Sequence, residues 1–265
     1  MMIPLTTPAD QAGPQRVVSV NLCADVLLLA LLPRDRIVSL SPYAADDAMS
    51  PLAAQALGIA VNHAQVEEII SLQPDLVLAG HFNGPEMLAL LRRLHVPLLV
   101  LDVPSSIAQT RAQIQQLASA LGVESRGERL IADMDLRMAA AVRGVAGTAP
   151  VAAVFRANGF TAGAGTLIDD LLVAARLDNL ARRAGIRGWG TLGLETLLLD
   201  RPALLVLDVG DTHPSLATAG LNHPALHALA ARVPVLRMPA KLWLCAGPWM
   251  TDAVERLAIA RRALH

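Results

Sequence analysis

The sequence is poor in aromatic side chains. It has three tryptophans, three phenylalanines and one tyrosine in 265 residues, although 54% of its residues are hydrophobic. Aromatic side chains usually supply a large part of a buried core. We therefore expect cores made of aliphatic residues, with the few aromatics reserved for another purpose.

Several other features are absent, and each absence excludes a class of function. The net charge is −1 and no basic cluster exceeds Arg-Arg, so nothing indicates a nucleic-acid partner. The longest apolar run, Val26 to Leu32, is too short to span a bilayer. No HExxH, GxSxG or CxxC motif occurs, and Gly163-Ala164-Gly165 lacks the remaining residues of a nucleotide-binding loop. The sequence thus predicts no catalytic residues, no metal site and no cofactor.

Residues 1–15 are rich in proline, threonine and alanine and contain no apolar signal-peptide core. They resemble a flexible leader from which a signal peptide has been trimmed and to which a start methionine has been added. A cytoplasmic protein with an irregular N-terminus is the alternative, and the residues do not decide between the two.

One long helix is predicted from Glu124 to Gly144. Ser125 and Glu128 have the spacing of a capping box, which predicts the start. Apolar residues follow at spacings of four and three, and glycine ends the helix. The apolar stripe consists of Leu130, Met134, Met138, Val142 and Val145.

The segments on either side of this helix resemble each other. In residues 67–80 and again in residues 195–208, a glutamate stands seven residues before a proline and an apolar strand follows. This similarity predicts two related α/β halves joined by one helix. Chance similarity between two βα units is the alternative interpretation.

Strand and helix patterns alternate throughout both halves, which favours parallel sheets with right-handed crossovers. The predicted fold class is α/β, with two Rossmann-like lobes joined by a single long helix and a ligand cleft between the lobes. The predicted organisation is a leader (1–15), an N-terminal lobe (16–122), a linking helix (123–146) and a C-terminal lobe (147–265).

Open α/β sheets bind ligands at the carboxyl ends of their strands, so the loops at those ends hold the candidate binding residues. Every aromatic residue falls in or next to such a loop, which indicates a large planar or apolar ligand, although some of the aromatics could instead pack locally beneath loops. The candidates are Asn21, Cys23, Tyr43, His81 and Phe82 in the first half, and Arg156, Asn158, Phe160, Trp189, Trp243, Cys245 and Trp249 in the second.

Cys23 and Cys245 are the only cysteines, and each follows a predicted strand of a different lobe. Three interpretations remain open from the residues alone. They are two unrelated buried thiols, a disulfide of the kind that an oxidising compartment permits, or soft sulfur ligands for a bound metal or its chelate.

From about Arg16 to its end, the chain resembles the helical-backbone (class III) periplasmic substrate-binding proteins of ABC importers. The resemblance rests on four stretches in their order and spacing: RVVSVN, VEEIISLQPDLVLAG, GFTAGAGTLIDDLLVAARLDNLA and GWGTLGLETLLLDRPALLVLD. Members of this class bind cobalamin, siderophore-bound iron or heme. Within it, the chain is most similar to the cobalamin-binding proteins, although the cysteines and the LCAGPW run depart from them.

The resemblance implies a monomeric periplasmic binding protein, not an enzyme, that delivers a large metal chelate to an ABC importer. Trp189 stands six residues before Glu195, which matches a ligand-stacking tryptophan, while Tyr43, His81-Phe82 and Trp243 match cleft positions. Glu67 and Glu195 match the acids that meet permease arginines. A corrinoid is the first expected ligand, followed by an iron-siderophore or heme. The competing hypothesis is a metal-handling or chelatase-like enzyme that uses both cysteines and a histidine.

Overall fold

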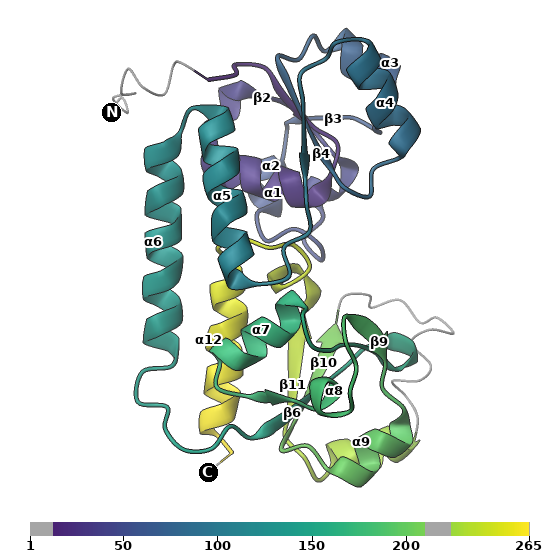
Figure 1. The fold of residues 1–265 in the computed structure, drawn as a ribbon, viewed down its shortest axis with the longest axis vertical. Helices are drawn as coiled ribbons and strands as arrows, with labels where there is room; N and C mark the ends of the chain where they lie inside the picture. The colour runs from purple at the N-terminus through teal and green to yellow at the C-terminus, as the bar shows by residue number, and fades with distance from the viewer. Residues whose placement is uncertain (1–12, 210–223, 265) are drawn as a thin grey trace. The chain divides into compact units, whose positions relative to one another are not determined.

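The computed structural model describes residues 13–209 and 224–264, so most of the leader predicted over residues 1–15 lies outside the described residues (Figure 1). The chain forms two compact units. The N-terminal lobe comprises the residues up to Pro104 together with Thr110–Ala132, and the C-terminal lobe comprises Ser105–Gln109 and Asp133 onward. No described helix is long and apolar enough to cross a membrane.

The N-terminal lobe contains a five-stranded parallel sheet in the order β3-β2-β1-β4-β5. Its central strands are buried on both faces because helices cover them, which is why they read as continuous aliphatic runs. The strands are β1 (Val17–Ser19), β2 (Ile37–Leu40), β3 (Ala60–Val61), β4 (Leu76–Gly80) and β5 (Leu98–Leu101). The helices are α1 (Leu22–Leu31), α2 (Ala53–Ala56), α3 (Val66–Ser71), α4 (Pro85–Arg93), α5 (Ile107–Leu121) and the first part of α6 (Glu124–Ala141).

The C-terminal lobe repeats this scheme with a four-stranded parallel sheet in the order β11-β10-β6-β8. Its strands are β6 (Val151–Phe155), β8 (Asp178–Asn179), β10 (Leu204–Val209) and β11 (Val235–Pro239). Its helices are α7 (Leu167–Ala174), α8 (Leu180–Arg183), α9 (Leu194–Asp200), α11 (Pro224–Ala230) and α12 (Met250–Arg262). Two parallel-sheet lobes confirm the predicted fold class.

Helix α6 confirms the predicted long helix and its start at Glu124, but not the capping box that was expected there. The helix begins at Glu124, so Ser125 lies inside the first turn and the predicted capping box is wrong. The start is set instead by the tight turn after α5. There Gly122 adopts a left-handed φ of 67°, and the Val123 backbone N–H donates to the Ala118 carbonyl at 2.8 Å. This closing of α5 at a left-handed glycine leaves no room for a serine cap.

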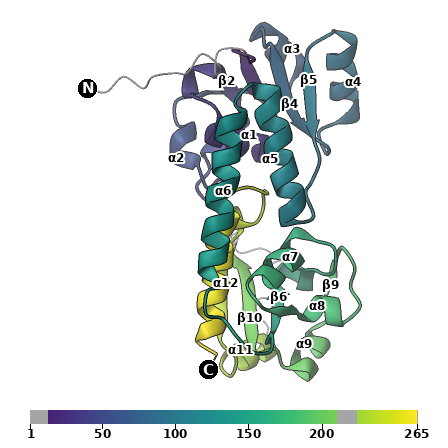
Figure 2. The same ribbon diagram turned by 60° about the vertical axis from the view of Figure 1, so that its left-hand side comes forward.

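Figures 1 and 2 both show α5 and the first half of α6 side by side. Their close approach depends on Gly127, because a Cβ atom added there would stand 2.5 Å from the Ala118 Cβ atom. In the C-terminal lobe, Arg137 on α6 pairs with Glu255 at 3.0 Å and with Asp252, both on α12. Each half of α6 is therefore fixed to the lobe to which it belongs.

We expect Gly127→Ala to destabilise the protein. Alanine gains about 1 kcal/mol in helix propensity over glycine, but overpacking costs about 1–3 kcal/mol, and neither helix can retreat without losing the rest of its contact. The measurement is the midpoint of urea unfolding. Gly84→Ala is the matched control, because a Cβ atom at Gly84 meets nothing within 4 Å. An unchanged midpoint for Gly127→Ala would contradict the tight packing.

Two short strands outside the main sheets pair into a small antiparallel sheet. Strand β7 (Phe160–Ala162) pairs with β9 (Trp189–Thr191), and Ala162 lies opposite Trp189. Phe160 and Trp189 are therefore diagonal neighbours on one face. Glycines beside β7 and β9 let the two backbones approach closely. A Cβ atom at Gly163 would stand 2.1 Å from the Ile186 carbonyl oxygen.

The described cores are almost entirely aliphatic, as expected. The aromatics divide into a buried group and an exposed group. Phe155, Trp243 and Trp249 are buried. Tyr43, Phe82, Phe160 and Trp189 are between 39% and 84% exposed, so these four present large apolar surfaces outward, which is unusual for residues of this size.

Candidate ligand-binding pockets

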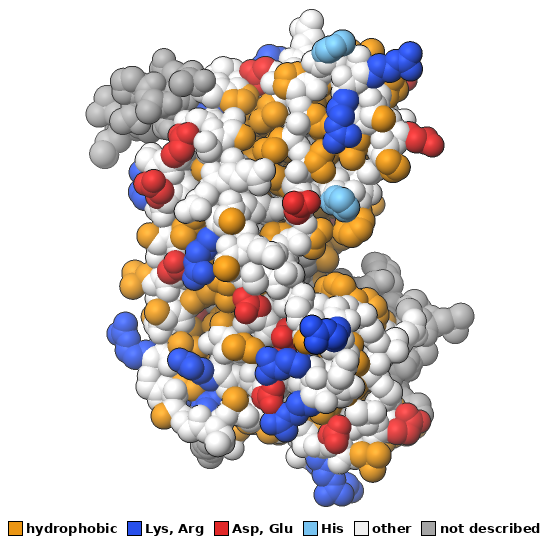
Figure 3. All heavy atoms as spheres, in the orientation of Figure 1, with side chains coloured by type: hydrophobic (Ala, Val, Ile, Leu, Met, Phe, Trp, Pro, Cys, Tyr) orange, Lys and Arg blue, Asp and Glu red, His pale blue; other side chains and the backbone are white. Residues whose placement is uncertain are grey.

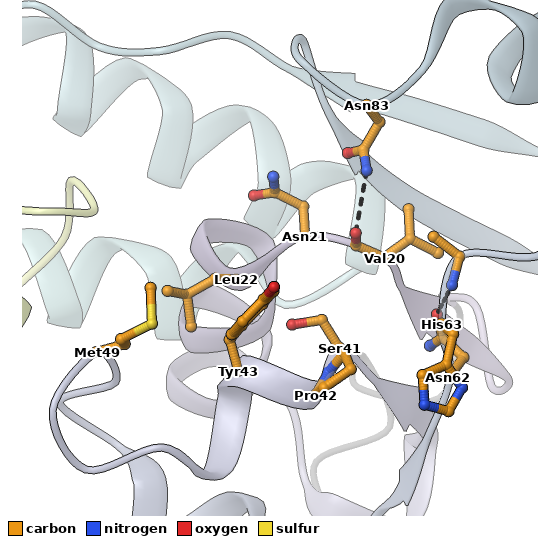
Figure 4. A pocket seen from close by; sticks show the side chains of 11 residues that line it. Val20, Asn21, Leu22, Ser41, Pro42, Tyr43, Met49, Asn62, His63 and Asn83 are labelled. Atoms are coloured by element: carbon orange, nitrogen blue, oxygen red, sulfur yellow. Dashed lines mark hydrogen bonds between the residues drawn. The ribbon is translucent and has the colours of Figure 1, made fainter.

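A pocket of about 530 Å³ lies at the carboxyl ends of β1, β2 and β4 in the N-terminal lobe. Figure 4 shows side chains from the loops after these strands meeting at this pocket. Tyr43 projects from the short 3₁₀ helix Pro42–Ala45 and is 55% exposed. The residues that line it include Asn21, Tyr43, Met49, Asn62, His63 and Asn83.

Three asparagine side chains shape this pocket through hydrogen bonds to backbone groups. The Asn21 side chain caps α1 by accepting from the Cys23 backbone N–H at 2.9 Å. The buried Asn62 amide donates to the Ser19 carbonyl at 2.9 Å and thereby ties the end of β3 to β1. The Asn83 amide donates to the Val20 carbonyl at 3.1 Å, and Figure 4 draws this hydrogen bond as a dashed line between the two labelled residues. These side chains hold the strand ends in place, so the pocket is preformed.

Asp25 lies beneath this pocket and is fully buried in α1. Its carboxylate accepts hydrogen bonds from the Ser41 backbone N–H and hydroxyl, and Ser41 also lines the pocket. Burial raises the pKa of Asp25 to about 6, although hydrogen bonds from Ser19 and Ser41 oppose that rise. An aspartate in this environment is protonated at mildly acidic pH.

The structure brings together only some of the residues predicted in this lobe. Asn21 and Tyr43 line the pocket. His81 and Phe82 follow β4 and contact each other edge to face at 5.6 Å, but they are not among the residues lining it. Sequence reasoning missed Met49, Asn62, His63 and Asn83. The signal for Asn62 was available, since it directly follows the short strand β3 at the same sheet edge.

A second pocket, of about 210 Å³, lies at the carboxyl end of β6 in the C-terminal lobe. Phe160 and Trp189 stack with ring centroids 5.3 Å apart and planes 3° from parallel. The Arg156 guanidinium carbon lies 5.9 Å from the Phe160 ring centroid and 5.6 Å from that of Trp189. Trp243, Ile168 and Leu244 complete the lining. The arrangement offers a flat apolar wall with a cation at its edge.

Arg156 is paired with a buried acid. Its Nε lies 2.7 Å from Oδ2 of Asp208, and the Trp243 indole N–H donates to the same oxygen at 3.3 Å. Burial raises the pKa of Asp208, while the Arg156 charge and the Trp243 hydrogen bond oppose that rise. Sequence reasoning missed Asp208. Leu207 is in register with Phe155, so the residues that follow them, Asp208 and Arg156, lie side by side at the ends of their strands.

The remaining predicted residues of both lobes do not line either of these two pockets. Asn158 is exposed with a left-handed φ of 56°. Trp249 is buried, and its indole N–H donates to the Cys245 carbonyl at 2.6 Å. Cys23 is half-buried and Cys245 is buried. Neither cysteine is a free thiol, so the interpretation as two separate free thiols does not describe the structure. Ligand contact by these four residues stays a prediction.

The predicted docking acids lie at equivalent places. Glu67 is exposed in the first turn of α3, and Glu195 is exposed in the first turn of α9. On the face drawn in Figure 3, basic side chains are interleaved with acidic ones. No group of three or more histidine, cysteine, aspartate or glutamate side chains among the described residues is arranged to hold a metal ion.

Comparisons with known proteins place this fold. Curated protein sequences gave no match. The periplasmic heme-binding protein RhuT from Roseiflexus sp. RS-1 is 24% identical, with a TM-score of 0.73 over 95% of this chain and 99% of its own. A periplasmic heme-binding protein from Pseudomonas aeruginosa is 23% identical, with a TM-score of 0.71 over 93% and 92%. The periplasmic vitamin B12-binding protein BtuF of Vibrio cholerae is 20% identical, with a TM-score of 0.69 over 95% and 98%.

At these identities the similarity to solved structures establishes the fold. Membership follows from the sequence, since the family model described as "Periplasmic binding protein" matches residues 17–230, most of the chain. The two-lobed structure with parallel sheets agrees with that match. The chain therefore belongs to the periplasmic binding protein family.

Proposed function

We propose that this protein is the periplasmic solute-binding component of an ABC importer for a large metal chelate, and that a corrinoid is the most favoured candidate for that chelate. The observation that carries the proposal is the stacked pair Phe160–Trp189 in the C-terminal pocket. Two large rings held parallel and partly exposed suit a ligand with a broad, flat, apolar face, and they cost little conformational entropy on binding because β7 and β9 already hold them.

The similar structures support a ligand of this size. Those named above are described as binding heme or vitamin B12, and both compounds are metal-containing macrocycles. The charge of the pockets favours the corrinoid. Arg156 is the cation that lines the C-terminal pocket in the described part of the chain, and a buried acid neutralises it. An anionic iron-siderophore needs several cations around it.

Heme is the second candidate. The exposed phenol of Tyr43 at the N-terminal pocket is a hard oxygen donor, which suits ferric heme, and tyrosine serves as a heme ligand in other proteins. The two candidates differ in their side chains, because heme carries carboxylates where corrinoids carry carboxamides. Absorbance spectroscopy separates them, since binding of Tyr43 to ferric heme would change the Soret band.

Cyanocobalamin is expected to bind and to quench the tryptophan fluorescence. Trp189→Ala should weaken that binding by about 10- to 100-fold, because one stacking contact contributes roughly 1–3 kcal/mol. Isothermal titration calorimetry measures the affinity independently of the lost fluorophore. Trp189→Phe keeps an aromatic ring, so its affinity for cyanocobalamin should lie between those of the wild type and Trp189→Ala.

Leu199→Ala is the control, because Leu199 is 80% exposed on α9 in the same lobe and does not line the pocket. If cyanocobalamin does not bind the wild type but hemin does, the corrinoid assignment is wrong while the proposed role in chelate import stands. Equal affinities for wild type and Trp189→Ala would refute the stacking role.

A further inference from the structure

We propose that Asp208 is a positioning and charge-balancing residue that makes the C-terminal pocket select uncharged hydrogen-bond acceptors, such as carboxamides, over carboxylates. The inference rests on the proposed function, since it concerns how the same pocket tells one macrocycle from another. It assigns to Asp208 a role in specificity, although this side chain is buried and lies beneath residues that line the pocket.

The geometry shows how Asp208 acts through Arg156. Both residues stand at the carboxyl ends of adjacent parallel strands, β10 and β6, so the sheet register brings them together. The ion pair of 2.7 Å engages Nε of Arg156. Among the described residues none accepts from its two terminal nitrogens, and Arg156 lines the pocket. Asp208 therefore fixes one edge of the guanidinium and leaves the other edge for a ligand.

The charges decide which ligand group that free edge prefers. The Asp208 side chain is only 2% exposed, so solvent screens its charge weakly and it offsets the charge of Arg156 at the pocket. A carboxylate would have to leave water for an aromatic pocket whose cation is already compensated, which is unfavourable. An amide carbonyl has a much smaller desolvation cost and still accepts the guanidinium N–H groups.

A second observation indicates that Asp208 is present for its charge rather than for its hydrogen bonds. Its Oδ1 is buried and has no hydrogen-bond partner in the described part of the chain. A buried carboxylate oxygen without a donor is destabilising, so an aspartate here is a poor structural choice. Asparagine would fill nearly the same space and keep an acceptor for both Arg156 and Trp243.

Corrinoids allow a direct test, because the same ring can carry either kind of side chain. Dicyanocobinamide presents carboxamides, and dicyanocobyrinic acid presents carboxylates in their place. We expect the wild type to bind the amide form at least about tenfold more tightly. In Asp208→Asn the charge of Arg156 is uncompensated, so dicyanocobyrinic acid should bind more tightly than it does to the wild type. The preference for the amide form, measured as the ratio of the two dissociation constants, should therefore fall by about tenfold. Calorimetric titration at neutral pH measures both.

Asp178→Asn is the matched control. It removes the same charge from the same lobe, but Asp178 pairs with Arg182 at 2.6 Å and with Arg183, and it does not line the pocket. The ratio of the dissociation constants of the two corrinoids should be the same for Asp178→Asn as for the wild type. Arg156→Gln provides a second variant. It should still bind dicyanocobinamide more tightly than dicyanocobyrinic acid, because the cation that would attract the carboxylates is gone. Thermal melts verify that each variant is folded.

The ratio separates this inference from a structural role, since a loosened pocket weakens both corrinoids alike. If the wild type binds both and Asp208→Asn leaves the ratio unchanged, the corrinoid function stands and the inference is refuted. If the wild type prefers the acid, the inference is refuted as well. If the wild type binds neither corrinoid, the proposed ligand itself is wrong.

Discussion

Reversal of charge at both Glu67 and Glu195 is expected to abolish corrinoid import while leaving corrinoid affinity unchanged. Each glutamate is exposed in the first turn of a helix, one in each lobe, at matching places in the two sequence repeats. Paired surface acids suit docking onto a basic permease surface, because complementary charge fixes the orientation and accelerates association. Neither residue lines a described pocket, so binding of the ligand should not change.

The measurement is uptake of cyanocobalamin in the native host with the variant as its sole copy, together with calorimetric affinity in vitro. Glu86→Arg combined with Glu128→Arg is the matched control, because both are exposed helical glutamates and the net charge changes equally. The single reversals should each reduce uptake in part. Uptake that survives the double reversal would mean that Glu67 and Glu195 are ordinary helix N-terminal acids, stabilised by the helix dipole.

Asp25→Asn is expected to change how the free energy of unfolding depends on pH, by about 2.4 kcal/mol between pH 4 and pH 7. The folded-state pKa is about 6 against an ordinary value of 3.8, so the folded protein binds the proton more tightly than the unfolded chain. The contribution of Asp25 to stability is thus fully present below pH 4 and is lost as the pH rises through about 6. The size follows from about 1.4 kcal/mol for each pKa unit.

Urea unfolding of wild type and variant across this range measures the difference. The variant should gain stability relative to the wild type as the pH rises, because asparagine has no charge to bury and can still bond Ser41. Glu68→Gln is a control of opposite sign in the same lobe. Hydrogen bonds from His63 lower the pKa of Glu68, so its contribution is lost as the pH falls. A pH-independent difference for Asp25→Asn would contradict a buried titrating acid.

The fold could be predicted from the sequence because its signals are local and periodic. Strands β4 and β10 coincide with the apolar strands predicted in residues 67–80 and 195–208, since strands buried on both faces need continuous apolar residues. The start of α6 at Glu124 was predicted, but the capping box assigned to Ser125 was wrong, because a left-handed turn at Gly122 takes the place of side-chain capping. A capping side chain and a left-handed turn can each provide hydrogen bonds for the backbone groups at a helix end, and only the fold shows which of the two is used.

The candidate site was predicted less completely for a related reason. Tyr43, Arg156, Phe160, Trp189 and Trp243 were chosen by chemical type at strand ends, and each of them lines a pocket. What the sequence could not show was contact between segments far apart in it. The pairing of β7 with β9 stacks Phe160 on Trp189, and the β6–β10 register sets Asp208 beneath Arg156. No local pattern encodes either contact.

The strand order of the two sheets has a consequence for synthesis of the chain. In each lobe the first strand made becomes an interior strand. β1 needs β2 and β4 as neighbours, and β6 needs β8 and β10. The chain must therefore extend some fifty residues past β6, to Leu204–Val209, before both sides of that strand are paired. Until then β6 presents an open, aliphatic edge of the kind that templates aggregation. We therefore expect a nascent chain halted before β10 to aggregate more readily than the complete chain.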